Sequence, residues 1–290
     1  MKHKEGDVMM SETIKNFMKK KEYLICIDSD GCAMDTMDIK HKKCFGPCIV
    51  ETWKMYEFEE EILKRWDDIN LYTMTRGINR FKGLLMMLEE INEHMRSIEG
   101  LNDYKNWVES TKELSNKSLE KILMKKESTC LRKALEWSNY VNEKITQLED
   151  SEKLPFEGVL EGLKAAHEVA DIAIVSSANY QAIIDEWEHY NLLEHTDIVL
   201  SQDVGTKAYC ISELLKCGYQ KEHVIMVGDA PGDYEAAQKN GVLYYPIIVR
   251  HEKSSWDKLK NESIQRFTSN TFKGEYENSL NNEFLENLKS

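Results

Sequence analysis

Tyr23–Asp35, with the sequence YLICIDSDGCAMD, gives the clearest structural signal in the chain. Its apolar run Leu24–Ile27 has the length and β-branched content of a buried strand, and it ends abruptly in Asp28 and Asp30, followed by Gly31. Ligands of open parallel sheets bind beyond the carboxyl ends of the strands, so we expect both carboxylates at a functional edge. The alternative is a buried strand followed by an ordinary turn, because Asp, Ser and Gly all favour turns.

Composition and charge restrict the class of protein. The chain has 290 residues, 41% of them apolar, which is enough for one large domain or two of ordinary size. Its formal net charge of -13 argues against nucleic acid or an anionic membrane as the main partner, because both are polyanions. The seven cysteines are scattered, and we find neither a signal-peptide core nor a long apolar stretch. We therefore expect a cytoplasmic protein with reduced thiols and no membrane association.

Two helical regions flank the first motif in sequence. We expect a short helix over residues 11–20, with Ile14, Phe17 and Met18 on its apolar face. The longer region, 36–152, is rich in Glu, Lys, Met, Leu and Trp at helical spacing and has hardly any Gly or Pro. This pattern predicts an all-helical insert with amphipathic faces suited to a bundle.

From residue 154 onward, strand and helix patterns alternate. The predicted strands are 172–175, 197–200, 223–227 and 243–249, and the predicted helices are 159–169, 181–190, 207–217 and 234–239. Such repeated units imply a parallel sheet with helices on both faces, and Pro246 in the last strand indicates a sheet edge. We expect the polar tail 251–290 to fold as helices against this core because it carries aromatic residues; a disordered tail is the alternative.

Reactive side chains follow three predicted strands and begin one predicted helix. They are Asp28 with Asp30, Ser176, Lys207, and Asp229 with Asp233. Carboxylates from separate strand ends can hold a hard divalent cation, and Ser and Lys suit a phosphate group. One carboxylate beside the metal can attack phosphorus to form an aspartyl-phosphate, while a second, two residues along, points to the same side. The pattern therefore favours phosphoryl transfer over a set of unrelated turns.

These segments resemble the four motifs of the haloacid dehalogenase superfamily of phosphohydrolases. The resemblance rests on Asp28-Ser29-Asp30-Gly31 with Asp35, on Ser176, on Lys207, and on Gly228-Asp229 with Asp233. It implies an α/β fold, with a Rossmann-like doubly wound parallel sheet formed by 1–35 and 153–250 and an inserted helical cap of the first type over 36–152. The helical extension over 251–290 is expected from its aromatic residues alone.

The resemblance also implies catalytic roles. Asp28 would be the nucleophile, and Asp30 the general acid that protonates the leaving oxygen and later activates water. Ser176 would hydrogen-bond the transferring phosphoryl group, and Lys207 would neutralise its charge. The acid at position 30 argues against the dehalogenase and phosphonatase branches, which lack one there.

A magnesium ion is implied in the same way. The resemblance gives Asp28, the main-chain carbonyl of Asp30, and Asp229 as its ligands. Asp233 would support the metal-bound waters or orient Lys207. Mg²⁺ is therefore the expected cofactor.

Substrate contacts are expected from two places. Ser177 and Asn179 follow Ser176 closely in the sequence and are expected to help bind the substrate. In the insert, Arg76 and Arg80 belong to a basic cluster interrupted by Gly and Asn, and a guanidinium fork suits phosphate or carboxylate. A solvated connection between helices is the alternative for this cluster.

The leading interpretation is a magnesium-dependent phosphatase acting on a small phosphorylated metabolite. A phosphomutase would share every core motif, and a non-catalytic binding protein is disfavoured because Asp28 and Asp30 are both present. Cys44 and Cys48, with His41 upstream, form an irregular pattern without a fourth ligand, so we do not expect a structural zinc site.

Overall fold

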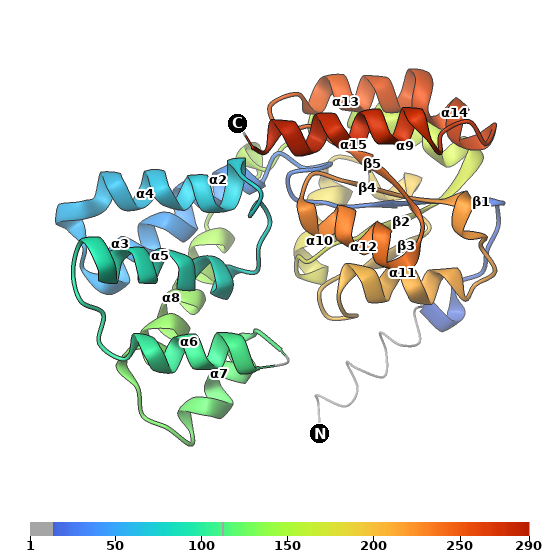
Figure 1. Cartoon of the computed structure of the whole chain (residues 1–290). Coiled ribbons are helices and arrows are strands. Elements are labelled where there is room, and N and C mark those ends of the chain that lie inside the picture. The colour runs from blue at the N-terminus through green and yellow to red at the C-terminus, as the bar shows by residue number, and fades with distance from the viewer. Residues whose placement is uncertain (1–13, 112, 290) are drawn as a thin grey trace. The chain divides into compact units, whose positions relative to one another are not determined.

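The computed structural model describes residues 14–111 and 113–289, and the chain divides into two compact units (Figure 1). The first, here called the sheet unit, contains the chain up to Thr36 and from Lys153 onward. The second, the helical unit, is Met37–Glu152. The helical unit is thus an insertion that begins one residue after Thr36, shortly beyond the first acidic motif.

A parallel sheet organises the sheet unit. Within the described residues it has the strand order β3-β2-β1-β4-β5. The strands are β1 (Tyr23–Ile27), β2 (Ala170–Val175), β3 (Ile198–Leu200), β4 (Val224–Gly228) and β5 (Leu243–Pro246). In β1, at the centre, Ile25 lies opposite Ile172 on one side and Ile225 on the other. Because helices cover both faces, β1 is a continuous apolar run rather than an alternating one.

Helices cover both faces of the sheet (Figure 1). Between residues 153 and 289 the α-helices of this unit are α9 (Val159–Val169), α10 (Tyr180–His189), α11 (Lys207–Leu215), α12 (Pro231–Asn240), α13 (Glu252–Lys258), α14 (Ile264–Thr268) and α15 (Glu275–Asn287). Helices α9 and α10 share one apolar cluster with Ile25 and Ile27 and with the C-terminal helices. Helices α11 and α12 pack against each other on the opposite face. The doubly wound α/β class predicted from the sequence is confirmed.

The C-terminal segment 251–289 is helical and buried against the sheet unit. Trp256, Phe267, Phe272 and Phe284 are all 2% exposed or less. Their burial explains why a tail of polar composition folds: the aromatic rings supply the apolar area that its other side chains lack.

Several element boundaries differ from the prediction, and two of the differences have a clear cause. Helix α12 begins at Pro231, three residues early, because proline fits the first helical position and lacks the N–H that would be unpaired there. Strand β5 ends at Pro246 rather than residue 249, since its partner among the described strands, β4, ends opposite it at Gly228. As Pro246 indicated, β5 lies at the sheet edge.

The predicted N-terminal helix over 11–20 is wrong at its C-terminal end. Its helical conformation stops at Asn16, and Met18, expected on the apolar face, is 77% exposed. The reason lies in Asp171, whose Oδ2 accepts hydrogen bonds from the backbone N–H groups of Lys20 and Lys21 at 2.9 and 3.0 Å. These bonds fix the backbone just before β1 in a conformation that is not helical. The start of the predicted helix lies outside the described residues.

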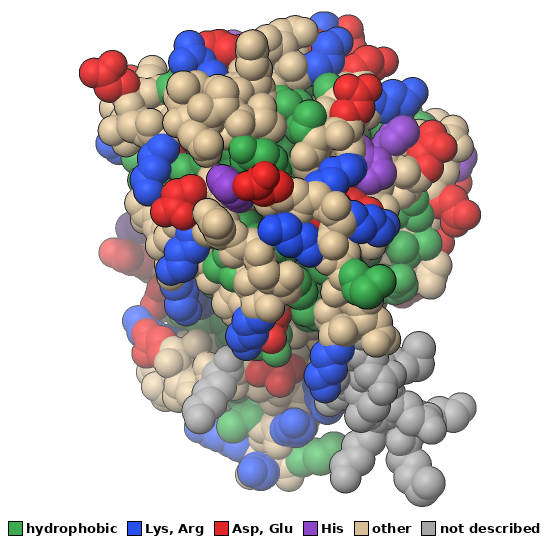
Figure 2. All heavy atoms as spheres, turned by 90° about the vertical axis from the view of Figure 1, so that its right-hand side faces the viewer, with side chains coloured by type: hydrophobic (Ala, Val, Ile, Leu, Met, Phe, Trp, Pro, Cys, Tyr) green, Lys and Arg blue, Asp and Glu red, His purple; other side chains and the backbone are tan. Residues whose placement is uncertain are grey.

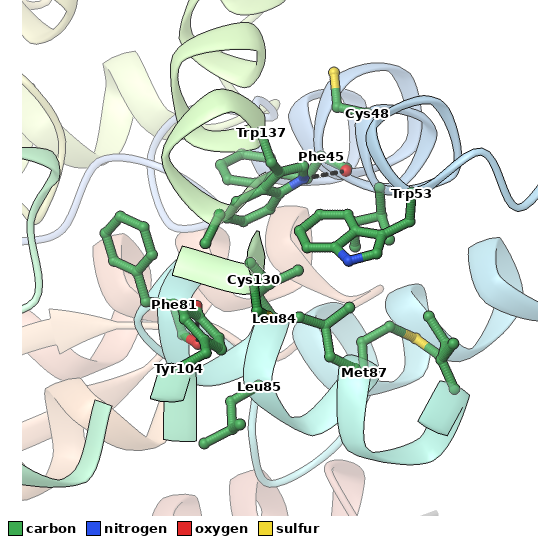
Figure 3. Close-up of a cluster of buried hydrophobic side chains, with 14 of the residues drawn as sticks. Phe45, Cys48, Trp53, Phe81, Leu84, Leu85, Met87, Tyr104, Cys130 and Trp137 are labelled. Carbon is green, nitrogen blue, oxygen red and sulfur yellow. Dashed lines mark hydrogen bonds between the residues drawn. The ribbon is translucent and has the colours of Figure 1, made fainter. Parts of the chain in front are cut away.

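The helical unit consists of helices and short helical turns within the described residues. Its α-helices are α2 (Met37–Lys40), α3 (Gly46–Trp53), α4 (Glu59–Asp67), α5 (Arg80–His94), α6 (Leu101–Ser110), α7 (Asn116–Leu123) and α8 (Thr129–Thr146). Figure 3 shows its core, where the Trp137 indole N–H donates to the Phe45 carbonyl at 3.1 Å. The predicted amphipathic faces are confirmed, since Trp66, Leu84 and Leu131 are fully buried.

The surface gives two further observations. None of the described helices is both long and apolar enough to span a membrane. On the face drawn in Figure 2, basic and acidic side chains are interspersed rather than gathered by sign.

Asp171 provides a test of how the chain enters the sheet. It is fully buried, and its Oδ2 also accepts the hydroxyl of Tyr219. We expect Asp171→Ala to lower the free energy of unfolding by about 2–4 kcal/mol, because three donors lose their acceptor. Tyr219→Phe removes one of these bonds and should cost about 1 kcal/mol. Denaturant unfolding checks both values, and equal losses would contradict the shared-acceptor role of Asp171.

Candidate active site

The loop after β1 is held in a tight turn. The Asp28 N–H extends the ladder by donating to the Val227 carbonyl at 3.0 Å. The Ser29 carbonyl accepts from the N–H groups of Ala33 and Met34, both at 2.9 Å. Gly31 has a φ of 79°, a left-handed conformation that a side chain would strain. The motif therefore fixes the backbone that carries both acids.

Lys207 joins two of the predicted acids. Its Nζ lies 2.7 Å from Asp28 Oδ2 and 2.5 Å from Asp233 Oδ1. Thr206 caps α11 by accepting from the Tyr209 N–H, so Lys207 occupies the first helical position with its side chain directed at the strand ends. Segments far apart in sequence thus converge on one buried ion-pair network.

Gly228 makes room for Asp233. A Cβ at position 228 would lie 2.4 Å from the Asp233 Cγ, closer than any real contact. Asp233 also accepts the Ala230 N–H through its Oδ2 at 3.1 Å, which pairs an N–H at the start of α12. The Gly-Asp motif is therefore needed for packing as well as for its acid.

Three buried carboxylates are close enough to share a cation. Single oxygens of Asp28, Asp229 and Asp233 all lie within 4.8 Å of one another. Oxygen donors of this kind fit Mg²⁺, which prefers carboxylates and water. Both oxygens of Asp233 already bind other groups, Lys207 and the Ala230 N–H. The donor set thus fits magnesium best through Asp28 and Asp229, with Asp233 in a supporting position.

The other predicted core residues lie at the same edge of the sheet. Asp30, two residues beyond Asp28, accepts the Thr36 hydroxyl at 2.5 Å. Ser176 is 3% exposed at the end of β2, and its Oγ accepts from the Ala178 N–H at 3.2 Å.

Two residues close to Ser176, Ser177 and Asn179, were predicted to contact the substrate. Ser177 is exposed. The side-chain oxygen of Asn179 caps α10 by accepting from the Gln181 and Ala182 N–H groups. The acceptor of Asn179 is therefore already used within the fold, while its amide donors keep their capacity for a ligand.

The two predicted cap arginines belong to the helical unit. Arg76 is 3% exposed and donates to the Leu71 carbonyl at 2.6 Å. Arg80, half-buried, donates to Asn142 Oδ1 at 2.7 Å and lies 4.9 Å from the centre of the Phe45 ring. No ion pair with a carboxylate is found for Arg80 among the described residues, and burial lowers its pKa to about 10.

Cys44 and Cys48 are free, buried thiols. The imidazole of His41 is also engaged, because its Nδ1 accepts the Trp66 indole N–H at 3.0 Å. Among described residues, the acidic cluster at the sheet edge is the one group of side chains that meets the geometric requirements for a metal site. The cysteines therefore serve as apolar core residues.

Burial disfavours charge on the nucleophile candidate. It raises the pKa of Asp28 to about 6, with Asp233 adding to the rise and Lys207 opposing it. Burial likewise raises the pKa of Asp233. For Lys207, burial works in the opposite direction, but Asp233 and Asp28 outweigh it and raise its pKa. Without a metal ion, the network thus carries more negative charge than its one ammonium group balances.

This imbalance predicts a pH-dependent effect of Asp28→Asn on the protein in chelator. The folded-state pKa of about 6 exceeds the unfolded value of about 3.9, so the charged carboxylate costs stability above pH 6. We expect Asp28→Asn to stabilise the metal-free protein by about 1–3 kcal/mol at pH 7.5. The gain should shrink as the pH falls towards 4, since the wild type then takes up its proton.

Denaturant unfolding at several pH values measures this gain. The control is Asp185→Asn, which changes an exposed carboxylate that accepts only the Gln181 amide. A gain that is independent of pH, or absent at pH 7.5, would contradict the burial argument.

Two contacts of this site were not foreseen. Thr36 donates to Asp30, and the Trp187 indole N–H donates to the buried Ser29 Oγ at 2.9 Å. Neither of the two donors, Thr36 and Trp187, belongs to one of the four motifs. Trp187 and Ser29 lie 158 residues apart, so local sequence patterns carry no signal for their contact.

Several solved structures resemble the fold at low sequence identity. A haloacid dehalogenase-like hydrolase from Streptococcus pneumoniae is 12% identical, with a TM-score of 0.46, covering 83% of this chain and 91% of its own. A protein from Lactobacillus delbrueckii subsp. bulgaricus, provisionally assigned as a phosphoglycolate phosphatase, is 15% identical, with a TM-score of 0.49 and coverages of 77% and 85%. One from Thermotoga maritima, provisionally assigned as a β-phosphoglucomutase, is 14% identical, with a TM-score of 0.46 and coverages of 82% and 97%. Similarities at this level carry no information on the reaction.

The sequence itself matches a family model. A comparison with curated proteins gave no match. The model of haloacid dehalogenase-like hydrolases matches residues 97–246, just over half of the chain. The matched range contains Ser176, Lys207, Asp229 and Asp233, and it begins after Asp28. The chain belongs to the haloacid dehalogenase-like hydrolases.

Proposed function

We propose that this protein is a magnesium-dependent phosphatase that removes phosphate from a small phosphorylated metabolite through an aspartyl-phosphate on Asp28. The observation that supports it most is the contact of Lys207 with Asp28 at 2.7 Å beside the carboxylates of Asp229 and Asp233. A nucleophile, a cation and a metal-binding acid pair at one sheet edge are what phosphoryl transfer requires.

The proposed reaction has two displacements. The Asp28 carboxylate attacks phosphorus, and the ester P–O bond breaks while Asp30 gives its proton to the leaving oxygen. Asp30 then takes a proton from water, whose oxygen attacks the phosphoryl group and releases phosphate from Asp28. The Thr36 hydroxyl, which donates to Asp30, would keep this carboxyl group in one orientation. Lys207 and Ser176 would stabilise the charge on the transferring oxygens.

Magnesium would be held by Asp28, the Asp30 carbonyl and Asp229, where it would neutralise carboxylate and phosphoryl charge. Asp233 keeps Lys207 in place through their contact at 2.5 Å. Burial raises the pKa of Asp28 to about 6 with Lys207 beside it, so the carboxylate is mostly ionised at neutral pH, and a bound cation would favour this nucleophilic form further.

The function is tested by screening phosphorylated metabolites for phosphate release with magnesium. We expect activity that disappears in excess chelator and returns with magnesium. Asp28→Asn should abolish it, because the change is nearly isosteric and removes the nucleophile. Asp185→Asn serves as the control and should keep full activity.

Two results would contradict this proposal. One is full activity of the wild type in excess chelator. The other is retention of more than a few per cent of activity by folded Asp28→Asn, with deamidation excluded. Acid quench after labelled substrate gives a direct measurement, since the phosphorylated wild-type enzyme should be trapped and the variant should stay unlabelled.

We further propose that the helical unit selects the substrate through Arg80. Its guanidinium is half-buried and bound to neutral groups, so an anionic substrate group would supply the missing countercharge. We expect Arg80→Ala to raise KM about tenfold for the best metabolite of the screen and to spare a small generic phosphate ester.

Arg65→Ala is the matched control in the same unit. Arg65 already forms a two-pronged pair with Glu90, with both N–O distances at 2.7 Å, so its charge is compensated. If Arg80→Ala changes the ratio of the two activities no more than Arg65→Ala does, Arg80 is only a structural residue. Arg76, a second predicted substrate contact, should be compared in the same assay.

A further inference from the structure

We infer that Trp256, in the C-terminal segment, is a positioning residue that holds the Asp28 loop in its catalytic shape. The loop in question is 28–34, defined by the tight turn after β1. The inference rests on the proposed function for its kinetic consequence, while its structural part can be measured without any activity.

Trp256 binds the loop directly. Its indole is fully buried, and its N–H donates to the Cys32 carbonyl at 2.9 Å. The Cys32 N–H and Sγ are directed elsewhere, to the Ser29 and Val227 carbonyls. With Cys32 itself fully buried, loss of the indole would leave its carbonyl without this bond in an apolar site.

Helix α9 is shaped to receive this indole. A Cβ at Gly162 would lie 2.6 Å from Trp256 Cε3, and a Cβ at Gly158 would lie 3.3 Å from Trp256 Cβ. An alanine at 162 would therefore displace the ring. Helix α13 is fixed in turn, because the Tyr245 hydroxyl donates to the Ser255 carbonyl at 2.6 Å. The donor thus has a defined position relative to the sheet.

The loop needs such an external tether. Its own turn is closed by the bond from Gly31 N–H to Met34 carbonyl at 2.8 Å, and the chain returning from the insert adds one from Phe156 N–H to Ala33 carbonyl at 3.0 Å. Trp256 adds a further attachment, from a segment 224 residues away. A displaced nucleophile loses rate steeply, because attack on phosphorus requires close alignment. The C-terminal segment therefore belongs to the catalytic machinery as a support.

The test compares Trp256→Phe with Trp137→Phe. Both substitutions remove a buried indole–carbonyl hydrogen bond, but Trp137 binds Phe45 in the helical unit. In Trp256→Phe we expect kcat for a small phosphate ester to fall about tenfold, with KM changed less than about twofold. Amide hydrogen exchange of the loop peptide should be faster by a similar factor. Trp137→Phe should change neither.

Gly162→Ala is the second variant. It leaves the loop and the indole N–H chemically intact and moves the ring by contact. We expect the same direction of change in loop exchange and kcat, so the test stands even if Trp256→Phe does not fold. A folded Trp256→Phe or Gly162→Ala with unchanged loop exchange and unchanged kcat would overturn the inference. If the wild type releases no phosphate, the proposed function fails, and the exchange result alone decides the positioning role.

Discussion

The ion-pair network of Lys207 with Asp28 and Asp233 is the constraint on which the sheet unit depends. All three side chains are largely shielded from water, and burial of charge is costly unless partners lie within contact distance. The partners come from β1, from the start of α11 and from the start of α12. The strand order places β1 between β2 and β4, and this arrangement brings these ends together. The chemistry of the site therefore depends on the strand order.

The sequence was sufficient to predict those elements whose local pattern indicates a single kind of secondary structure. Helix α9 has the predicted limits, 159 and 169, because Gly158 stands immediately before it and strand β2 begins immediately after it. The central strand was evident because burial on both faces requires an unbroken apolar run. The acids at strand ends were predictable for a related reason. A charged residue that stops such a run marks the point where the buried strand ends.

Contacts between distant segments were not predictable in this way. The helix expected over 11–20 had a sound apolar pattern, yet the backbone N–H groups of Lys20 and Lys21 donate to the buried carboxylate of Asp171, and the chain is not helical there. The same holds at the site, where Trp187 and Thr36 bind the acidic loop without any local signature. Local propensity fails where a buried polar group elsewhere in the chain needs partners, because leaving it unpaired costs more than one helical turn provides.

Buried acids and buried indoles play complementary parts in this fold. Burial raises the pKa of Asp28, and repulsion from Asp233 adds to the rise. Indole N–H groups are neutral donors that fix backbone and hydroxyl oxygens without adding charge. Trp187 and Trp256 supply such donors from α10 and from the C-terminal helices. The loop is thus held through a backbone carbonyl and the Ser29 hydroxyl by uncharged donors, so these attachments add no charge to the site and do not use its carboxylates.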